Sequence, residues 1–172
     1  MNRPSVETFR RQEKMPLVVV VDNVRSLNNI GSLFRTADGF ALEGLILCGI
    51  AATPPSPEIH KTALGAENSV EWRYFDKTAD AISALKADGY KLCCLEQVID
   101  SVSLEDFRPD FAAGGKYALV VGNEVDGVDP EVVNACDHCI EIPQLGTKHS
   151  LNVSVSAGIA MWHFFEYYLK TR

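Results

Sequence analysis

Continuous apolar runs alternate along the chain with segments whose apolar residues recur at helical spacing. The β-branched and aliphatic runs at residues 17–22 and 44–50 predict strands buried on both faces, as in parallel sheets. Further strands are predicted at 70–75, 90–98, 116–122 and 140–142, and helices at 5–14, 29–38, 77–89, 130–135 and 153–169, with a helical turn at 58–64. Strands that alternate with helices indicate one α/β domain around a parallel sheet.

The segment from Cys139 to Leu169 has the most unusual pattern. A short apolar run ends at Pro143, a loop containing Gly146 follows, and Ser150 occupies the position expected for a helix N-cap. The helix that follows is apolar on nearly every side. Such a helix is buried all round, either in a large core or against a second chain. In a chain of 172 residues we favour a subunit interface over a central core helix in a monomer.

Composition narrows the classes of protein. The net charge of −7 argues against a generic polyanion binder, although Arg25, Arg35, Lys61 and Lys148 lie in or near polar loops. Five cysteines, an odd number, indicate a reduced, cytoplasmic protein. The sequence has no apolar run near the roughly 20 residues that a membrane span needs, and its start lacks a signal-peptide pattern.

Polar loops follow three of the predicted strands, at the sheet edge where open parallel sheets bind ligands. The first contains Asn29, Gly31 and Arg35 at the start of a helix. Gly31 and Arg35 are four residues apart and share a helix face, where a guanidinium can fork onto phosphate oxygens and the glycine allows close approach of a backbone. A helix start with an unrelated surface arginine accounts for the same residues.

The second and third loops are equally open to two interpretations. Residues 122–127 read GNEVDG, which is not the GxGxxG spacing of a dinucleotide fold. The two glycines indicate a tight turn, and Glu124 could cap neighbouring backbone or accept from a ligand. In the third loop, Ser150 could be a plain helix cap or could hold a substrate hydroxyl, with Asn152 close by.

A metal site is not expected. Cys136 and Cys139 form a single C-x-x-C pair, which lacks the second ligand pair of a structural zinc site. His60, His149 and His163 are isolated, and their spacing indicates no catalytic triad.

Taken in order, the three loops resemble the three motifs of the SpoU (TrmH) family, within the SPOUT class of S-adenosylmethionine-dependent RNA methyltransferases. Residues 29–35 match N-x-G-x-x-x-R, residues 122–127 match G-N-E-x-x-G, and residues 142–152 match I-P-x-x-G-x-x-x-S-L-N. Each motif is weak alone, but three in order, each after a predicted strand, are highly specific. The resemblance covers residues 17–169 and looks closest to tRNA guanosine 2′-O-methyltransferases.

The resemblance implies a SPOUT methyltransferase domain at residues 16–172 with a C-terminal trefoil knot, after a short helical extension at residues 1–15. It also implies a homodimer packed partly through the last helix, and S-adenosyl-L-methionine as cofactor. The implied cofactor-binding residues are Leu95, Glu96, Gly122, Asn123, Gly127, Ile142, Leu145 and Leu151. RNA selection would rest on local basic residues of the dimer, on the N-terminal helix or on a partner.

The implied reaction transfers a methyl group to a ribose 2′-hydroxyl, most plausibly of a guanosine in tRNA of the D-loop guanosine 18 type. Arg35 is the expected catalytic residue, as a base or, more easily accepted chemically, as an anchor for the adjacent phosphate. Asn29 would hold Arg35 or the ribose, and Ser150 and Asn152 would orient substrate or cofactor. Glu124 would brace the cofactor loop.

Other functions fit the sequence less well. An rRNA substrate is the first alternative to tRNA. A non-catalytic dimer that binds RNA or S-adenosylmethionine is the second, and the joint presence of the motif residues argues against it. A nucleotide-dependent oxidoreductase is disfavoured because the GxGxxG motif and its acidic ribose-binding residue are missing.

Overall fold

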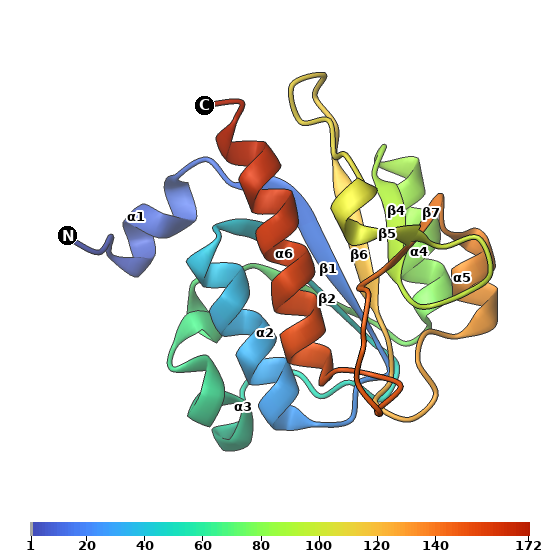
Figure 1. The fold of residues 1–172 in the computed structure, drawn as a ribbon. Coiled ribbons are helices and arrows are strands. Elements are labelled where there is room, and N and C mark those ends of the chain that lie inside the picture. The colour runs from blue at the N-terminus through green and yellow to red at the C-terminus, as the bar shows by residue number, and fades with distance from the viewer. Residues whose placement is uncertain (1) are drawn as a thin grey trace.

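A seven-stranded parallel sheet forms the centre of the computed structural model, which describes residues 2–172 (Figure 1). The strands are β1 (Met15–Asp22), β2 (Leu42–Cys48), β3 (Trp72–Phe75), β4 (Lys91–Leu95), β5 (Val102–Ser103), β6 (Tyr117–Val121) and β7 (His138–Glu141). They lie in the order β3-β2-β1-β6-β4-β7-β5, and every neighbouring pair is parallel. The prediction of a parallel α/β fold is confirmed.

Helices cover both faces of the sheet. They are α1 (Val6–Arg11), α2 (Leu27–Gly39), α3 (Pro57–Ala63), α4 (Thr78–Ala87), α5 (Pro130–Ala135) and α6 (Val153–Leu169), with 3-10 turns η1 (Ala66–Asn68) and η2 (Leu104–Asp106). Helices α2 and α6 pack together on one face, and α4 and α5 pack together on the other (Figure 1). The molecule is therefore a three-layer α/β/α sandwich.

Strand β1 shows why the central strands are continuous apolar runs. Leu17, Val19 and Val21 belong to the core cluster beneath α2 and α6. Val18 and Val20 point to the opposite face and pack with α4 and α5. Successive side chains of a strand alternate between faces, so a strand covered by helices on both sides needs apolar residues at every position.

Most element boundaries lie within a few residues of the predictions, and two differences affect the site. The strand predicted at 90–98 ends at Leu95, and the polar connection after it contributes the two-residue edge strand β5. The N-cap of α6 is Asn152, so the prediction of Ser150 as the cap is wrong. Asn152 Oδ1 accepts from the Ser154 and Val155 N–H groups, whereas Ser150 lies in the exposed loop before the helix.

The chain after β7 turns back across the sheet. β7 lies beyond β4, yet α6, which follows it, packs on α2 and β1 (Figure 1). This return path is consistent with the C-terminal knot that the resemblance implies. Among residues 2–172, the longest apolar helix still falls short of what a membrane crossing requires.

Candidate functional site

A cavity of about 490 Å³ opens at the carboxyl ends of β4, β6 and β7. Its walls come from three segments that are distant in the chain: residues 95–97, residues 121–127 and residues between 140 and 156. The carboxyl edge of a parallel sheet is where such folds bind ligands, and the volume falls within the roughly 300–1,000 Å³ of small-molecule sites. The second and third motif loops therefore share one site.

Most of the predicted cofactor residues line this cavity. Those that do are Leu95, Glu96, Gly122, Asn123, Gly127, Ile142 and Leu151. Leu145 does not, because it is fully exposed at the tip of its loop, away from the walls. Sequence reasoning missed several polar wall residues. Asp126, Gln144 and His149 occupy variable positions of the motifs, and Gln97, Glu141 and Ser156 lie outside them.

The turn at residues 122–128 is held closed by its own backbone and by one carboxylate. Asn123 and Gly127 exchange two backbone hydrogen bonds of 2.9 Å each. A Cβ on Gly122 would lie 2.2 Å from the Gly127 carbonyl carbon, and Gly127 has a φ of +70°. Glu96 braces the turn by accepting from the Val128 N–H at 3.0 Å. The brace predicted from the sequence is Glu124, whose carboxylate holds the same loop to the backbone before α2.

Glu124 binds the backbone at the start of α2, whose N-cap is Ser26. Its carboxylate accepts from the N–H groups of Arg25 and Ser26 at 3.0 Å and from Asn29 Nδ2 at 3.2 Å. Desolvation opposes ionisation, but these hydrogen bonds favour the carboxylate more strongly and hold the pKa of Glu124 below its usual value. Glu124 therefore fastens the second motif to the helix that carries the first.

Asn29 continues this network to the third motif. Its side-chain oxygen accepts from Asn152 Nδ2 at 3.2 Å, and Asn152 caps α6 through its own oxygen. Both ends of the Asn29 amide are thus occupied, by Glu124 and Asn152, so the expected contact with Arg35 is not formed. The hydrogen bonds Glu124–Asn29–Asn152 join all three motifs in one line.

We expect Glu124→Gln to destabilise the protein by about 1 kcal/mol at pH 7, because a carboxamide accepts these backbone hydrogen bonds less well than a carboxylate. Because the pKa of Glu124 is lower in the folded protein than in the unfolded chain, where it is about 4.3, the ionised carboxylate stabilises the folded state at any pH above 4.3. This stabilisation is lost as the pH falls through the lower pKa of the folded protein. Urea unfolding of both proteins should therefore show a difference at pH 7 that shrinks below about pH 4. The exposed Glu105, substituted in the same way, is the control. A difference that persists unchanged in acid would contradict this role of the carboxylate.

Asp22 is a buried carboxylate that sequence reasoning missed. It is 2% exposed at the end of β1, and it accepts from Thr78 Oγ1 at 2.5 Å, the Asp129 N–H at 2.9 Å and Asn23 Nδ2 at 3.0 Å. Buried charges persist only when they are well hydrogen-bonded. The available signal was an aspartate closing a β-branched run. Asp22 ties the carboxyl end of β1 to the starts of α4 and α5.

Arg35 lies outside the cavity, exposed on the surface of α2. The four ion pairs within residues 2–172 do not include it. The backbone that approaches Gly31 is that of α3, since a Cβ on Gly31 would lie 2.3 Å from the Ile59 carbonyl oxygen. Gly31 therefore serves helix packing, while the guanidinium one turn later remains free to contact a ligand.

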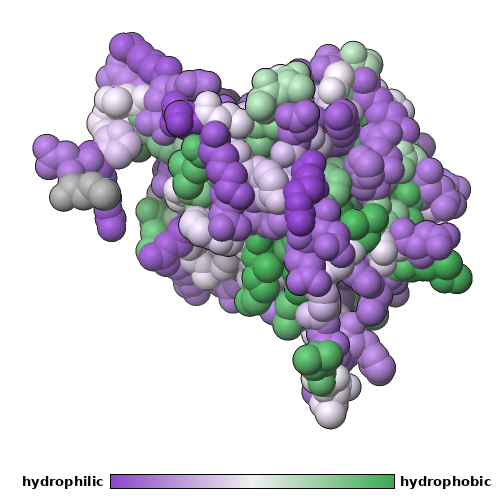
Figure 2. Space-filling model, turned by 45° about the horizontal axis from the view of Figure 1, so that its top comes forward, coloured by the Kyte–Doolittle hydropathy of each residue, from purple (hydrophilic) through white to green (hydrophobic). Residues whose placement is uncertain are grey.

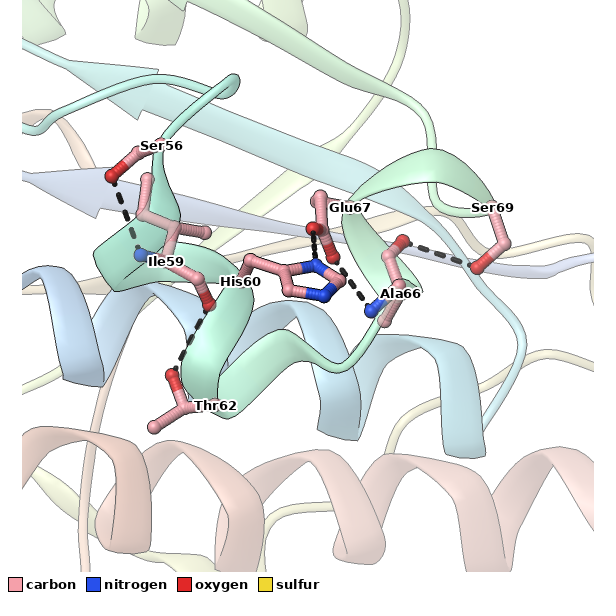
Figure 3. A network of polar contacts seen from close by, with 8 residues as sticks. Ser56, Ile59, His60, Thr62, Ala66, Glu67 and Ser69 are labelled. Carbon is pink, nitrogen blue, oxygen red and sulfur yellow. Dashed lines mark hydrogen bonds and ion pairs between the residues drawn. The ribbon is translucent and has the colours of Figure 1, made fainter.

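A polar network steadies the α3–η1 segment against which α2 packs (Figure 3). Ser56 caps α3 through the Ile59 N–H, and His60 Nδ1 lies 2.5 Å from Glu67 Oε1. Thr62 Oγ1 donates to the Asn28 carbonyl of α2 at 2.9 Å. These contacts fix α3 against the helix that carries Asn29 and Arg35.

The fold and the cavity define a ligand-binding α/β protein whose site is built from three polar loops at one sheet edge. A family model described as the SpoU rRNA Methylase family matches residues 16–162, and the chain belongs to this family.

Known proteins of this family resemble most of the chain. A Staphylococcus haemolyticus protein named as a TrmH family tRNA/rRNA methyltransferase is 30% identical over 93% of this chain and 62% of its own length. A structure of an AdoMet-bound rRNA methyltransferase from Sinorhizobium meliloti superimposes with a TM-score of 0.82 at 25% identity, over 92% of this chain and 60% of that one. A structure described as giving insight into the 2-OH methylation of C/U34 on tRNA superimposes with a TM-score of 0.76 at 26% identity. The match covers 91% of this chain and 97% of that one. The chain thus spans about three fifths of the first two proteins.

Proposed function

We propose that this protein transfers a methyl group from S-adenosyl-L-methionine (AdoMet) to a ribose 2′-hydroxyl of RNA. The observation that carries the proposal is the cavity itself, which gathers the second and third family motifs and is tied to the first by the Glu124–Asn29–Asn152 line. The similar S. meliloti methyltransferase has AdoMet bound. The structure related to 2-OH methylation of tRNA supports the ribose hydroxyl as acceptor.

The wall residues suit AdoMet. Leu95, Ile142 and Leu151 offer apolar surface for an adenine ring, while Gln97, Gln144 and backbone groups of the 122–127 turn offer hydrogen bonds. AdoMet supplies a methyl group already activated on a sulfonium. The protein's task is therefore to align donor and acceptor and to assist loss of the hydroxyl proton.

Arg35 is the residue assigned to the RNA. Its guanidinium is exposed and permanently charged, so it anchors a phosphate beside the target ribose more readily than it accepts a proton. Asn29, whose amide is occupied at both ends, is a positioning residue. Ser150 and Asn152 line the cavity and orient the cofactor or substrate.

The proposed substrate is a guanosine in tRNA, of the D-loop guanosine 18 type. This proposal rests on the sequence resemblance. The comparisons include enzymes of both tRNA and rRNA, so rRNA is the alternative. The test is transfer of labelled methyl from AdoMet to unmodified tRNA and rRNA in parallel, followed by nucleoside analysis. We expect 2′-O-methylguanosine in tRNA. Label in rRNA alone would overturn the substrate, and cofactor binding without label in either RNA would favour the non-catalytic dimer.

We also propose that the active form is a homodimer packed through α6. One side of this helix is buried on the sheet, but Val155, Ile159 and Trp162 on the other side are 51%, 41% and 49% exposed. Figure 2 shows hydrophobic side chains gathered in the middle of a face otherwise largely hydrophilic. A second copy of the chain would cover this stripe and make α6 buried all round, as its sequence predicts.

Ile159→Glu should convert the dimer to a monomer, because it places a charge in the middle of the apolar stripe. Light scattering at micromolar concentration measures the change. Leu64→Glu, at an apolar residue that is 60% exposed on the distant end of α3, is the control and should stay dimeric. A monomeric wild-type protein would refute the proposed dimer.

A further inference from the structure

Three of the five cysteines meet beside the cavity. Cys94 of β4 and Cys139 of β7 are paired in register on neighbouring strands, and their Sγ atoms lie 3.1 Å apart. Cys136, at the end of α5, lies near Cys94. Within residues 2–172, no group of three or more His, Cys, Asp and Glu side chains is arranged to hold a metal ion. The cluster therefore calls for an explanation other than metal binding.

The pairing of Cys94 with Cys139 suits a disulfide. Neighbouring strands lie about 4.8 Å apart, within the roughly 4.4–6.8 Å between Cα atoms that disulfides span. The two sulfurs already touch, so bond formation needs only a small movement of the side chains. A bond between directly opposed residues of parallel strands also leaves little freedom for its ideal geometry, which favours ready reduction.

The two thiols differ in access. Cys94 is fully buried, whereas Cys139 is partly exposed. Hydrogen bonding with Cys136, together with burial, raises the pKa of the Cys94 thiol. A small oxidant from solvent therefore reaches Cys139 before Cys94. Cys94 lies beside it and can act as the resolving thiol.

The pair is also adjacent to the cofactor walls. Leu95 and Ile140, the residues that follow Cys94 and Cys139, both line the cavity. Glu96, the first residue after β4, donates its N–H to the Ile140 carbonyl at 3.0 Å and braces the 122–128 turn through its carboxylate. A covalent bond between the strands at this level would shift the walls on both sides of the cavity.

We propose that Cys94 and Cys139 form a redox modification site, at which a hydroperoxide produces an intrachain disulfide that weakens AdoMet binding. The effect on AdoMet rests on the proposed function, whereas formation of the disulfide does not.

The oxidation balances in two steps. The Cys139 sulfur attacks one peroxide oxygen of hydrogen peroxide, the O–O bond breaks, and the products are a sulfenic acid at Cys139 and one water. The Cys94 sulfur then attacks the sulfenic sulfur, the S–O bond breaks, and the leaving hydroxyl departs as water with the Cys94 proton. Each sulfur loses one electron and the two peroxide oxygens gain two. A dithiol reductant reverses the reaction by exchange.

The experiment treats the full chain with hydrogen peroxide and measures intact mass, linked peptides and AdoMet affinity before and after. The variants are Cys139→Ser, which removes the site, and Cys136→Ser, a partly exposed neighbour that serves as the matched control. We expect wild type and Cys136→Ser to lose the mass of two hydrogen atoms, with a Cys94–Cys139 peptide, and Cys139→Ser to lose none. AdoMet affinity of the oxidised protein should fall about 5- to 150-fold, the usual range of coupling between sites, and recover with dithiothreitol.

Three results would overturn the inference: no intrachain disulfide in wild type, a disulfide mapped to Cys136, or equal AdoMet affinity of the oxidised and reduced proteins. Failure of the proposed function gives a different signature. In that case the reduced wild-type protein does not bind AdoMet at all, which refutes the coupling, while the mass and peptide data still decide whether the disulfide forms.

Discussion

Arg35→Ala is expected to lower methyl transfer by about 100- to 1,000-fold, the usual cost of removing one charged group that acts in the transition state. Arg35 lies outside the cavity, so binding of AdoMet should be unchanged. Its exposed position on α2 and its absence from the ion pairs of residues 2–172 mean that folding should not suffer either. Single-turnover transfer to the RNA that the labelled-methyl assay identifies, with cofactor titration in parallel, measures both quantities.

Two further variants sharpen this prediction. Arg73→Ala removes an exposed arginine from the edge strand β3 and should leave the rate unchanged. Arg35→Lys keeps the charge but loses the planar fork, so a phosphate anchor should keep part of its activity. Unaltered turnover of Arg35→Ala would remove the residue from the mechanism.

Gly122→Ala should have the largest effect on the cofactor. The added Cβ would lie 2.2 Å from both the Gly127 carbonyl carbon and the Val128 nitrogen, and these are backbone atoms that cannot move aside alone. The turn that closes one wall of the cavity must open, so AdoMet affinity should fall more than about tenfold, and overpacking should cost about 1–3 kcal/mol of stability. Calorimetric titration and urea unfolding measure the two effects.

Gly39→Ala is the matched control for this substitution. Gly39 ends α2, a Cβ there meets no atom within 4 Å, and its φ is not positive. Alanine at this position should therefore leave cofactor affinity unchanged and be neutral or slightly stabilising, since alanine favours helix more than glycine does. Equal cofactor affinity in the two variants would show that close packing at Gly122 does not shape the cavity.

The hydrogen-bond line Glu124–Asn29–Asn152 separates the motif residues that hold the fold from those that can contact a ligand. Arg35 is free to contact a ligand, whereas Glu124, although it lines the cavity, and Asn29 use their polar groups in hydrogen bonds within the protein. Their presence in the motifs is explained by the need to hold two helix starts at the sheet edge. Rates should therefore be less sensitive to substitution of these residues than to substitution of Arg35.

The helix and sheet layers of the fold, and the sheet edge that carries the cavity, could be predicted from sequence patterns alone. A strand buried on both faces must be apolar throughout, which made β1, β2 and β6 visible, and parallel strands bring their carboxyl ends to one edge, so loops after strands could be expected to meet there. The apolarity of α6 likewise indicated more burial than one sheet face provides.

The hydrogen-bond partners of the polar side chains could be learned only from the folded arrangement of the chain. Asn29 and Asn152 are 123 positions apart, and Glu96 braces the 122–128 turn because β4 and β6 are neighbours in the sheet. Local sequence could not distinguish Ser150 from Asn152 as the cap. It also could not predict that Asp22 is buried among three donors, that Leu145 is exposed, or that Cys94 and Cys139 are in contact. Each of these depends on the direction of a side chain toward a partner that the chain order does not reveal.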